Sequence, residues 1–309
     1  MTDDAVPGRI VVSGLHKTFG HFEAVKDLSF TVEPGRITGF LGPNGAGKTT
    51  TLRMLLGLIH PTRGTATIGG ARYVDLPHPT QTVGASLEAN FHPGRTGRNH
   101  LRVLAAAGGI PDERVDEMLH LVGIPAAANK AAGGYSMGMR QRLGLAGAML
   151  GDPRVLVLDE PANGLDPEGI RWLRQFLRHL AGEGRTILIS SHLLSEVEHT
   201  VDDVVIIANG RSVRSGAMEE IRGEPKVLVR TPNAGLLVEA LTARGVQSAT
   251  DPDGTVHAVT GDLALIGDTA LAAGVAVHEL RTEQADLEAL FFELTEAPEN
   301  ANRNLGAAS

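Results

Sequence analysis

The chain has 309 residues, 42% of them apolar and 21% charged, which is typical of a soluble globular protein with a buried core. Its formal net charge of −8 argues against sequence-independent nucleic-acid binding, which depends on clustered lysine and arginine. The absence of cysteine excludes disulfides and thiolate metal sites, and it is consistent with a reducing cytoplasm. No apolar run approaches the roughly 18 residues of a membrane span, and the acidic N-terminus does not resemble a secretory signal, so a membrane process would need another chain to cross the bilayer.

The first part of the chain predicts short strands around a glycine-rich loop. Residues 9–15 and 28–32 have strand composition, and residues 36–41 form a short apolar strand. A helix is expected at 49–58, where apolar residues recur at helical spacing. Residues 59–70 contain proline, glycine and alternating small residues, and they predict turns with an edge hairpin.

The middle of the chain alternates helices with apolar strands. Residues 97–150 are expected to be largely helical, with helical spacing at 99–107 and 112–122. The continuous apolar segment Val155–Leu158 is typical of a strand buried on both faces. The pattern then predicts a helix, a strand and a hairpin around an Asn-Gly turn, at residues 167–181, 186–189, 204–208 and 211–215.

The pattern changes near residue 225. Three strands are expected to alternate with three helices, a β-α-β-α-β-α order that indicates a small separate α/β domain. The expected strands cover 226–230, 255–259 and 275–280, and the expected helices cover 234–244, 263–273 and 284–294.

A phosphate-binding loop is the strongest motif. The segment Gly42-Pro-Asn-Gly-Ala-Gly-Lys48-Thr49 fits G-x-x-x-x-G-K-[ST] and lies between an expected strand and an expected helix. Glycines allow backbone N–H groups to surround phosphate oxygens, and the helix N-terminus adds the positive end of its dipole. Lys48 then places a positive charge on the β and γ phosphates, and the Thr49 hydroxyl ligates Mg²⁺. A glycine-rich turn with no ligand is the less favoured alternative.

Two acidic residues follow the apolar strand Val155–Leu158. Ligands of open α/β sheets bind at the carboxyl ends of strands, which is where Asp159 and Glu160 are expected. Asp159 is assigned to the Mg²⁺ site, and Glu160 is assigned as the general base that polarises the attacking water. A strand that ends in Asp-Glu is by itself more often a helix-capping turn, so this assignment depends on the phosphate-binding loop upstream.

Together these motifs resemble the ATP-binding-cassette (ABC) family over residues 9–224. The segment Tyr135-Ser136-Met137-Gly138-Met139 stands where the family has Leu-Ser-Gly-Gly-Gln, and only Ser136 and Gly138 match. The resemblance implies that these two residues act on a γ-phosphate held by a second cassette. It implies an α/β fold, a P-loop NTPase cassette with a mixed sheet and helices, an antiparallel β subdomain and a helical signature subdomain, plus a small C-terminal α/β domain.

The order of motifs in the family supplies further assignments. Asp166 resembles the loop that contacts the partner subunit, and His192 resembles the switch histidine that senses the γ-phosphate. Phe19 matches the aromatic residue that stacks on adenine, with an ordinary core phenylalanine as the alternative. Glu88 stands where most cassettes have glutamine, and Glu there is familiar among drug exporters; alternatively Glu88 is a solvated loop acid.

The resemblance implies ATP and Mg²⁺ as cofactors and assigns the site residues as follows. Nucleotide is bound by Phe19, Gly42, Pro43, Asn44, Gly45, Ala46, Gly47, Lys48, Thr49, Thr50, Ser136, Gly138 and Asp166; the metal is bound by Thr49, Glu88 and Asp159; and Lys48, Glu160 and His192 are catalytic.

The domain organisation follows the same resemblance. The cassette is expected at residues 9–224, with its helical subdomain at about 90–150, an accessory α/β domain at 225–297 and a frayed tail at 298–309.

We therefore expect an ATP-hydrolysing subunit that forms a dimer with a second cassette and drives export of a drug, antibiotic or lipid through a separate transmembrane permease. Because the chain is acidic, no nucleic-acid partner is expected. Such a subunit would be cytoplasmic and peripheral on the inner face of the cell membrane. Residues 83–110, with Phe91, Leu101 and Val103, are the expected docking surface. The alternatives are a soluble ABC ATPase acting on ribosomes or DNA, and a regulator that no longer hydrolyses ATP.

Overall fold

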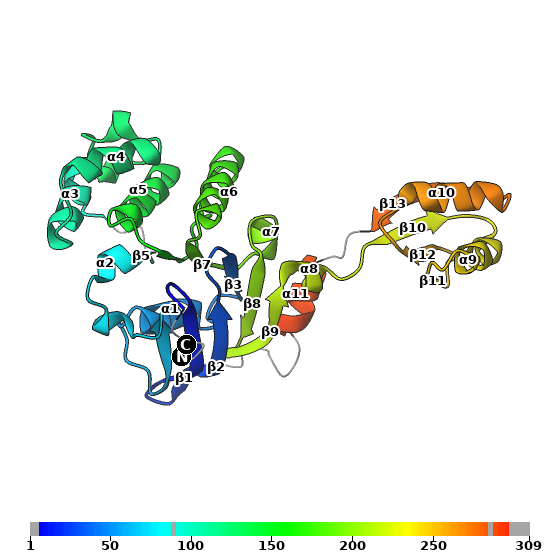
Figure 1. Ribbon diagram of the computed structural model, residues 1–309, viewed down its shortest axis with the longest axis horizontal. Coiled ribbons are helices and arrows are strands. Elements are labelled where there is room, and N and C mark those ends of the chain that lie inside the picture. The colour runs from blue at the N-terminus through cyan, green and yellow to red at the C-terminus, as the bar shows by residue number, and fades with distance from the viewer. Residues whose placement is uncertain (1–5, 88–90, 284–286, 297–309) are drawn as a thin grey trace, which may run out of the picture. The chain divides into compact units, whose positions relative to one another are not determined.

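The computed structural model describes residues 6–87, 91–283 and 287–296. Their contacts divide the chain into two compact units (Figure 1). One unit contains the residues up to Ala217 together with those from Glu288 onward, and the other is Met218–Leu287. The last helix, α11 (Leu287–Glu296), therefore belongs almost entirely to the first unit, whereas the sequence pattern groups it with the C-terminal domain. Periodicity predicts a helix without indicating which core its apolar face joins.

A six-stranded sheet with the order β5-β6-β7-β3-β8-β9 forms the centre of the first unit. The first five strands are parallel to their neighbours, and β9 runs antiparallel to β8. All four residues of β6 are buried, as the apolar pattern predicts. The strands are β3 (Ile37–Leu41), β5 (Val83–Ser86), β6 (Val155–Leu158), β7 (Thr186–Ser191), β8 (Asp203–Ala208) and β9 (Arg211–Ala217). Because β3, β6 and β7 run in one direction, their carboxyl ends meet at one edge of the sheet.

A three-stranded antiparallel sheet, β2-β1-β4, packs with the central sheet around one core. It contains β1 (Ile10–Phe19), β2 (Phe22–Val32) and β4 (Arg63–Ile68). The edge hairpin expected at residues 59–70 is a single strand, because β4 pairs with β1 instead of a sequence neighbour. Helix α1 (Lys48–Leu55) contributes Leu52 and Leu55 to the shared core. It ends before residue 58, and Gly57 adopts a left-handed φ of 69° directly after it.

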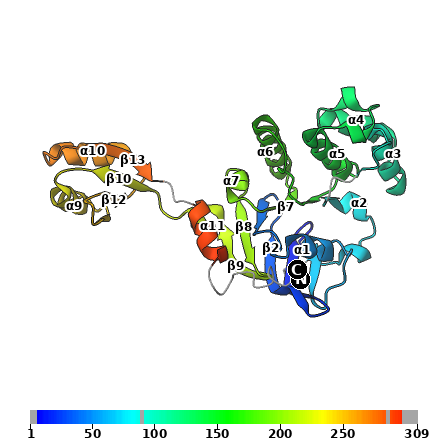
Figure 2. The same cartoon turned by 180° about the vertical axis from the view of Figure 1, so that it is seen from behind.

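Helices α3, α4, α5 and α6 lie at the top of the first unit, away from β1 and β2 (Figures 1 and 2). The helices that follow α1 in this unit, apart from α11, are α2 (Pro79–Thr82), α3 (Gly97–Ala107), α4 (Glu113–Leu121), α5 (Met137–Met149), α6 (Pro167–Gly182) and α7 (Leu194–Val197), with short 3-10 turns at Tyr73–Asp75, Pro125–Ala127 and Ala132–Gly134. Leu101 has no exposed surface, so its expected place on a docking surface is wrong; it occupies the core-facing side of α3, while Val103 is 49% exposed. Across the residues that the structure describes, no helix is both long and apolar enough to span a membrane.

The second unit contains a four-stranded antiparallel sheet with the order β11-β12-β10-β13. Its elements are α8 (Met218–Arg222), β10 (Lys226–Arg230), α9 (Ala234–Ala243), β11 (Ser248–Thr250), β12 (Val256–Val259), α10 (Leu263–Ala272) and β13 (Glu279–Glu283). From β10 to β13 this is the β-α-β-β-α-β order of ferredoxin-like folds. The sequence pattern missed β11, which has only three residues, and placed the last strand at 275–280 instead of Glu279–Glu283.

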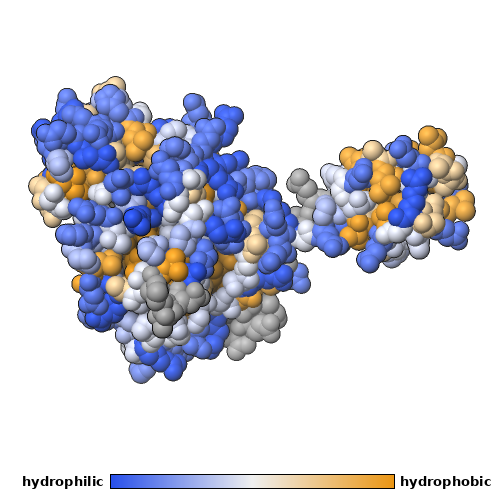
Figure 3. Space-filling view, viewed as in Figure 1, coloured by the Kyte–Doolittle hydropathy of each residue, from blue (hydrophilic) through white to orange (hydrophobic). Residues whose placement is uncertain are grey.

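The core of the second unit lies between its sheet and its two longer helices. Val227, Val229, Leu237, Leu241 and Ile266 have no exposed surface there. Apolar residues also reach the outside of this unit, as Figure 3 shows, and Leu236 and Leu271 are 54% and 79% exposed. The unit thus has a hydrophobic core of its own.

Candidate functional site

The glycine-rich loop joins β3 to α1, as the sequence predicts. Two of its glycines are required by close backbone contacts. A Cβ on Gly42 would lie 2.4 Å from the carbonyl oxygen of Ile207, and a Cβ on Gly47 would lie 2.6 Å from that of Ala24. Gly47 also has a φ of 103°, a conformation that L side chains rarely adopt. The capping residue of α1 is Gly47, which has no side chain to bond the first N–H groups, and the first turn contains no acidic residue. This helix N-terminus therefore suits an anion.

Lys48 is buried at the start of α1, with 6% of its surface exposed. Its Nζ donates to the carbonyl oxygen of Gly42 at 2.6 Å and lies 3.3 Å from Oε1 of Glu160. A buried ammonium group must be paired or hydrogen-bonded, and here both conditions are met by groups of the loop and of the acidic strand end. The lysine thus connects the two motifs that the sequence analysis singled out separately.

The two acids lie directly after β6. Asp159 Oδ2 accepts a 2.7 Å hydrogen bond from the Thr49 hydroxyl, and its Oδ1 accepts one from the Ser190 hydroxyl. Glu160 has a φ of 49°, which is uncommon for a residue with a side chain. Residues in such conformations cluster at functional sites, where the surrounding structure holds them. The structure therefore brings Thr49, Asp159 and Glu160 together, as the sequence predicts.

Ser190 is a site residue that the sequence analysis missed. It lies at the end of β7, has no exposed surface, and bonds both acids: its hydroxyl donates to Asp159 and accepts the backbone N–H of Glu160 at 3.0 Å. The sequence feature that could have indicated it is the pair of serines that follows the apolar segment 186–189. Both serines belong to β7, which continues to Ser191. Polar residues at the carboxyl end of a buried strand point to a site by the same argument that identified Asp159.

His192 follows β7 and lies beside Glu160, with its Nδ1 2.8 Å from Glu160 Oε2. Glu160 therefore has Lys48 on one carboxylate oxygen and His192 on the other. The structure confirms that these residues meet at one edge of the sheet, although they come from three different segments of the chain.

Ser136, Gly138 and Asp166 lie apart from this cluster. Ser136 caps α5 by accepting the N–H of Met139 at 3.2 Å, and Asp166 caps α6 by accepting that of Gly169 at 2.8 Å. Within the described part of the chain, no hydrogen bond or ion pair joins Ser136 or Asp166 to the Lys48 loop. Both side chains are exposed and lie at helix starts, so they are accessible to another molecule.

The remaining predicted residues lie around the loop or outside the description. Phe19 is 46% exposed, with Lys17 Nζ 4.8 Å from its ring centre, so its ring is not part of the buried core. Pro43, Asn44, Gly45, Ala46 and Thr50 form the loop and the first turn of α1, and Asn44 and Gly45 are exposed at its tip. Glu88 lies outside the described residues.

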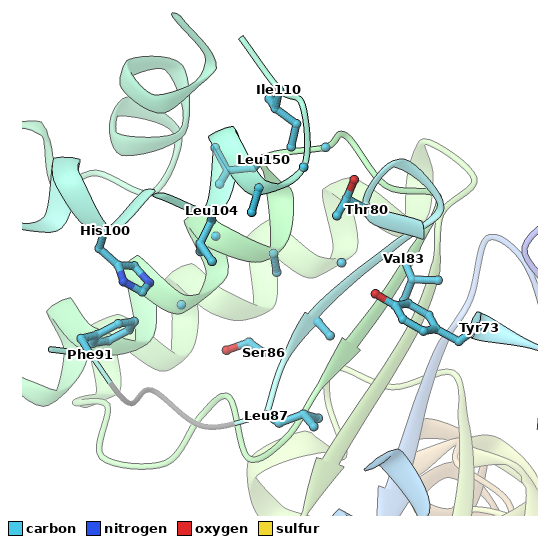
Figure 4. A pocket seen from close by; sticks show the side chains of 18 residues that line it. Tyr73, Thr80, Val83, Ser86, Leu87, Phe91, His100, Leu104, Ile110 and Leu150 are labelled. Atoms are coloured by element: carbon cyan, nitrogen blue, oxygen red, sulfur yellow. The ribbon is translucent and has the colours of Figure 1, made fainter. Parts of the chain in front are cut away.

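A hollow of about 390 Å³ lies between β5 on one side and α3 and α5 on the other (Figure 4). Apolar side chains dominate its lining, among them Val83, Leu104 and Leu150. His100 also lines it, edge-on to Phe91 with ring centres 4.6 Å apart. Among the described residues its buried Nδ1 has no hydrogen-bond partner. Burial, with a smaller effect of Arg95, lowers the pKa of His100.

Comparisons with known proteins identify the family. Residues 25–163 match the ABC transporter family, and residues 225–288 match a domain of unknown function. The bacitracin transport ATP-binding protein BcrA of Bacillus licheniformis is 45% identical over 206 residues, which are 65% of this chain and 67% of that protein. The chain belongs to the ABC transporter family. It is an ATP-binding subunit of an ABC transporter, and it hydrolyses ATP.

Other relatives of this ABC ATPase extend the comparison. The uncharacterized ABC transporter ATP-binding protein YcbN of Bacillus subtilis is 33% identical over 295 residues, covering 92% of this chain and 96% of that protein. The Nod factor export ATP-binding protein I of Burkholderia lata is 41% identical over 209 residues, 66% of this chain and 69% of that protein. Among solved structures, an ATP-binding subunit of an ABC transporter superposes with a TM-score of 0.62 at 30% identity, covering 69% of this chain and 91% of that one. The alternative of a soluble ATPase acting on ribosomes or DNA gains no support from these relatives.

Proposed function

We propose that this ABC ATPase hydrolyses MgATP between two cassettes and thereby drives export of a drug, antibiotic or lipid through a separate membrane-spanning subunit. The observation that carries the catalytic part is the cluster in which Glu160 lies between Lys48 and His192, next to Asp159. The same proposal includes the cassette bounds of 9–224 and an accessory role for the domain that follows. The sequence pattern extended that domain to residue 297, whereas α11 groups with the first unit.

In this proposal the loop from Gly42 to Thr50 surrounds the phosphates of ATP. Lys48 exchanges its contacts with Gly42 and Glu160 for contacts with the β and γ phosphates, which also releases the Glu160 carboxylate. Phe19 is 46% exposed, and we propose that adenine stacks on its ring. ATP binding thus separates the Glu160 carboxylate from Lys48 and leaves its contact with His192.

Thr49 and Asp159 are the proposed Mg²⁺ residues. Their oxygens already lie 2.7 Å apart, and hydroxyl and carboxylate oxygens are the donors that Mg²⁺ prefers. Bound Mg²⁺ would neutralise charge on the phosphates. Ser190 keeps the Asp159 carboxylate oriented towards Thr49, since it donates to the other carboxylate oxygen. Glu88 would reach the same metal, and it lies outside the described residues.

Glu160 is the proposed general base, oriented by its neighbours. A carboxylate released from Lys48 accepts a proton from the water that attacks the γ-phosphate. His192 Nδ1 lies 2.8 Å from the same carboxylate and holds Glu160 in place, and we assign His192 as the residue that senses the γ-phosphate. The backbone N–H of Glu160 is fixed by Ser190, which keeps the strained residue in one conformation.

The second cassette is proposed to be another copy of this chain. Ser136 and Gly138 lie at the start of α5 with no contact to their own Lys48 loop in the described structure, so ATP that they bind must be held by a partner. The Asp166 loop would contact that partner beside them. One chain contains one copy of each motif, so two chains complete two sites.

The hollow between β5, α3 and α5 is the proposed docking place for the membrane-spanning subunit. Its apolar lining and its volume suit one short segment of a partner protein. On α3, Val103 is exposed and available to a partner, whereas Leu101 is buried. Docking there would place the ATPase on the inner face of the cell membrane. The names of the bacitracin and Nod factor relatives favour an exported substrate.

Replacement of Glu160 by Gln tests the catalytic part. Glu160→Gln keeps the side-chain volume but removes the base, so we expect turnover to fall by at least about 100-fold, within the range for a lost general base. MgATP should then accumulate a dimer in size-exclusion chromatography, and Glu160→Gln combined with Lys48→Ala should remain monomeric. Full turnover in the Glu160→Gln protein would refute the assignment.

A further inference from the structure

The only tryptophan of the chain connects two helices that begin at the proposed partner-facing residues. The guanidinium of Arg142 on α5 lies over the ring of Trp172 on α6, with its central carbon 3.9 Å from the ring centre. Trp172 stacks in turn on Phe176, with ring centres 5.3 Å apart. Arg142 Nη1 also donates to the carbonyl oxygen of Val122 at 2.8 Å, so the guanidinium is held by α6 and by the end of α4.

The guanidinium has little freedom to leave this position. A Cβ on Gly123 would lie 3.1 Å from Arg142 Nη1, so this glycine leaves the room that the guanidinium occupies. The carbonyl of Val122 accepts one N–H while the flat face of the group rests on the indole. Arginine suits both contacts at once, because its group is planar, permanently charged and has five N–H donors.

A second set of contacts joins the beginnings of the same two helices. A Cβ on Gly164 would lie 3.0 Å from Met137 Cε, so the Met137 side chain rests directly on this glycine. Gln141 Nε2 donates to the carbonyl oxygen of Asn163 at 3.3 Å. The first turns of α5 thus lie on the loop that leads into α6.

The Arg142–Trp172 stack lies at the same distance from the starts of both helices. Arg142 follows the capping residue Ser136 by six positions, and Trp172 follows the capping residue Asp166 by six positions. At a rise of about 1.5 Å per residue, the stack lies roughly 9 Å along each helix from its cap. Contacts at the helix starts and a stack about 1.7 turns further fix both the separation and the relative direction of the helices.

We propose that Arg142 and Trp172 are positioning residues that fasten α5 to α6, so that Ser136 and Asp166 meet the partner's nucleotide as one surface. This inference rests on the proposed action of Ser136 on ATP held by a second cassette. Neither residue touches the Lys48 loop of its own chain in the described contacts, so they act on the dimer and not on nucleotide binding by the single chain.

Three substitutions test the proposal on the full chain. Trp172→Leu removes the ring face, and we expect kcat to fall by about 3- to 30-fold, the factor that corresponds to a partly desolvated cation–π pair. The dissociation constant for ADP, measured by calorimetry, should stay within about twofold of wild type, because ADP is bound by the single chain. Trp172→Phe retains an aromatic face and should keep kcat within about threefold.

Arg142→Gln removes the guanidinium, which α5 contributes to the stack as the partner of the ring. It should lower kcat like Trp172→Leu, and the double variant should be no worse than either single one, because both remove the same contact. Since Trp172 is the only tryptophan, its fluorescence in the Arg142→Gln protein should shift while the circular dichroism spectrum stays unchanged. If Trp172→Leu does not fold, the turnover of Arg142→Gln alone tests whether the stack fastens α5 to α6.

Wild-type kcat in both Trp172→Leu and Arg142→Gln would overturn the fastening role, and so would equal losses in Trp172→Leu and Trp172→Phe. Additive losses in the double variant would overturn the joint action. Ser136→Ala separates this inference from the proposed function: unchanged turnover in Ser136→Ala overturns the two-cassette site itself. Lost turnover in Ser136→Ala with full turnover in Trp172→Leu overturns the fastening alone.

Discussion

Replacing Ser190 should lower both the stability and the turnover of the protein, although its side chain is small. The side chain has no exposed surface, and one hydroxyl serves two acids, donating to Asp159 and accepting the N–H of Glu160 at 3.0 Å. Ser190→Ala removes both hydrogen bonds without adding bulk. It leaves the Glu160 N–H without its partner and lets the Asp159 carboxylate rotate away from Thr49.

The magnitude follows from those two bonds. A hydrogen bond to a charged group contributes about 1.5–3 kcal/mol, and an unpaired buried N–H costs about 1–3 kcal/mol. We therefore expect the free energy of unfolding of the first unit to fall by about 3 kcal/mol. At 2–4 °C per kcal/mol for a domain of this size, its Tm should fall by roughly 6–12 °C. A displacement of Glu160 by about 1 Å lowers turnover by up to about 100-fold.

Circular dichroism melting and a phosphate-release assay measure the two effects on one preparation. Ser191→Ala is the matched control, because Ser191 is also buried and its hydroxyl bonds the backbone of Leu193. The control should lose stability with a smaller loss of turnover. A Ser190→Ala protein with wild-type Tm and turnover would refute the assignment of Ser190 as the residue that orients both acids.

Two predictions concern the hollow beside α3. Burial lowers the pKa of His100, so the unfolded chain binds this proton more readily than the folded chain. The free energy of unfolding of wild type, relative to that of His100→Gln, should therefore fall as the pH drops below about 6.5 in urea titrations. A difference between the two proteins that does not change with pH would contradict this prediction. Leu104→Glu places a charge in the apolar lining and should abolish co-purification with the membrane-spanning subunit at unchanged basal ATPase activity. Leu121→Glu, on an exposed position of α4 outside the hollow, should leave co-purification intact, and equal binding by both variants would place docking elsewhere.

Local sequence patterns predicted the central elements of this fold well. Both ends of the strand Val155–Leu158 were predicted correctly, because four consecutive apolar residues flanked by proline and charged residues are typical of a short buried strand. The hairpin of β8 and β9 was predicted from Asn209 and Gly210, which both adopt positive φ values, as the tight turn requires. The phosphate-binding loop was likewise found from residues adjacent in sequence.

Features that depend on distant contacts were not predicted. Ser190 acts through residues about thirty positions away, and nothing in its neighbours distinguishes it from Ser191. Leu101 and Val103 lie on one short helix, and only the packing of α3 decided that Leu101 is inside. The three-residue strand β11 has no apolar pattern of its own, because its place is set by pairing with β12. Sequence patterns report on near neighbours, whereas these features arise when remote segments meet.

The route of the chain after Ala217 limits how the accessory unit can be removed. The chain leaves the first unit, completes the ferredoxin-like unit, and returns with α11, on which Phe291 and Thr295 are 5% exposed. A stop codon after residue 217 would therefore strip a helix from the cassette as well and uncover the surface against which Phe291 packs. A deletion of the accessory unit must instead join residue 217 to residue 288 through a short flexible linker, so that α11 can still pack on the first unit.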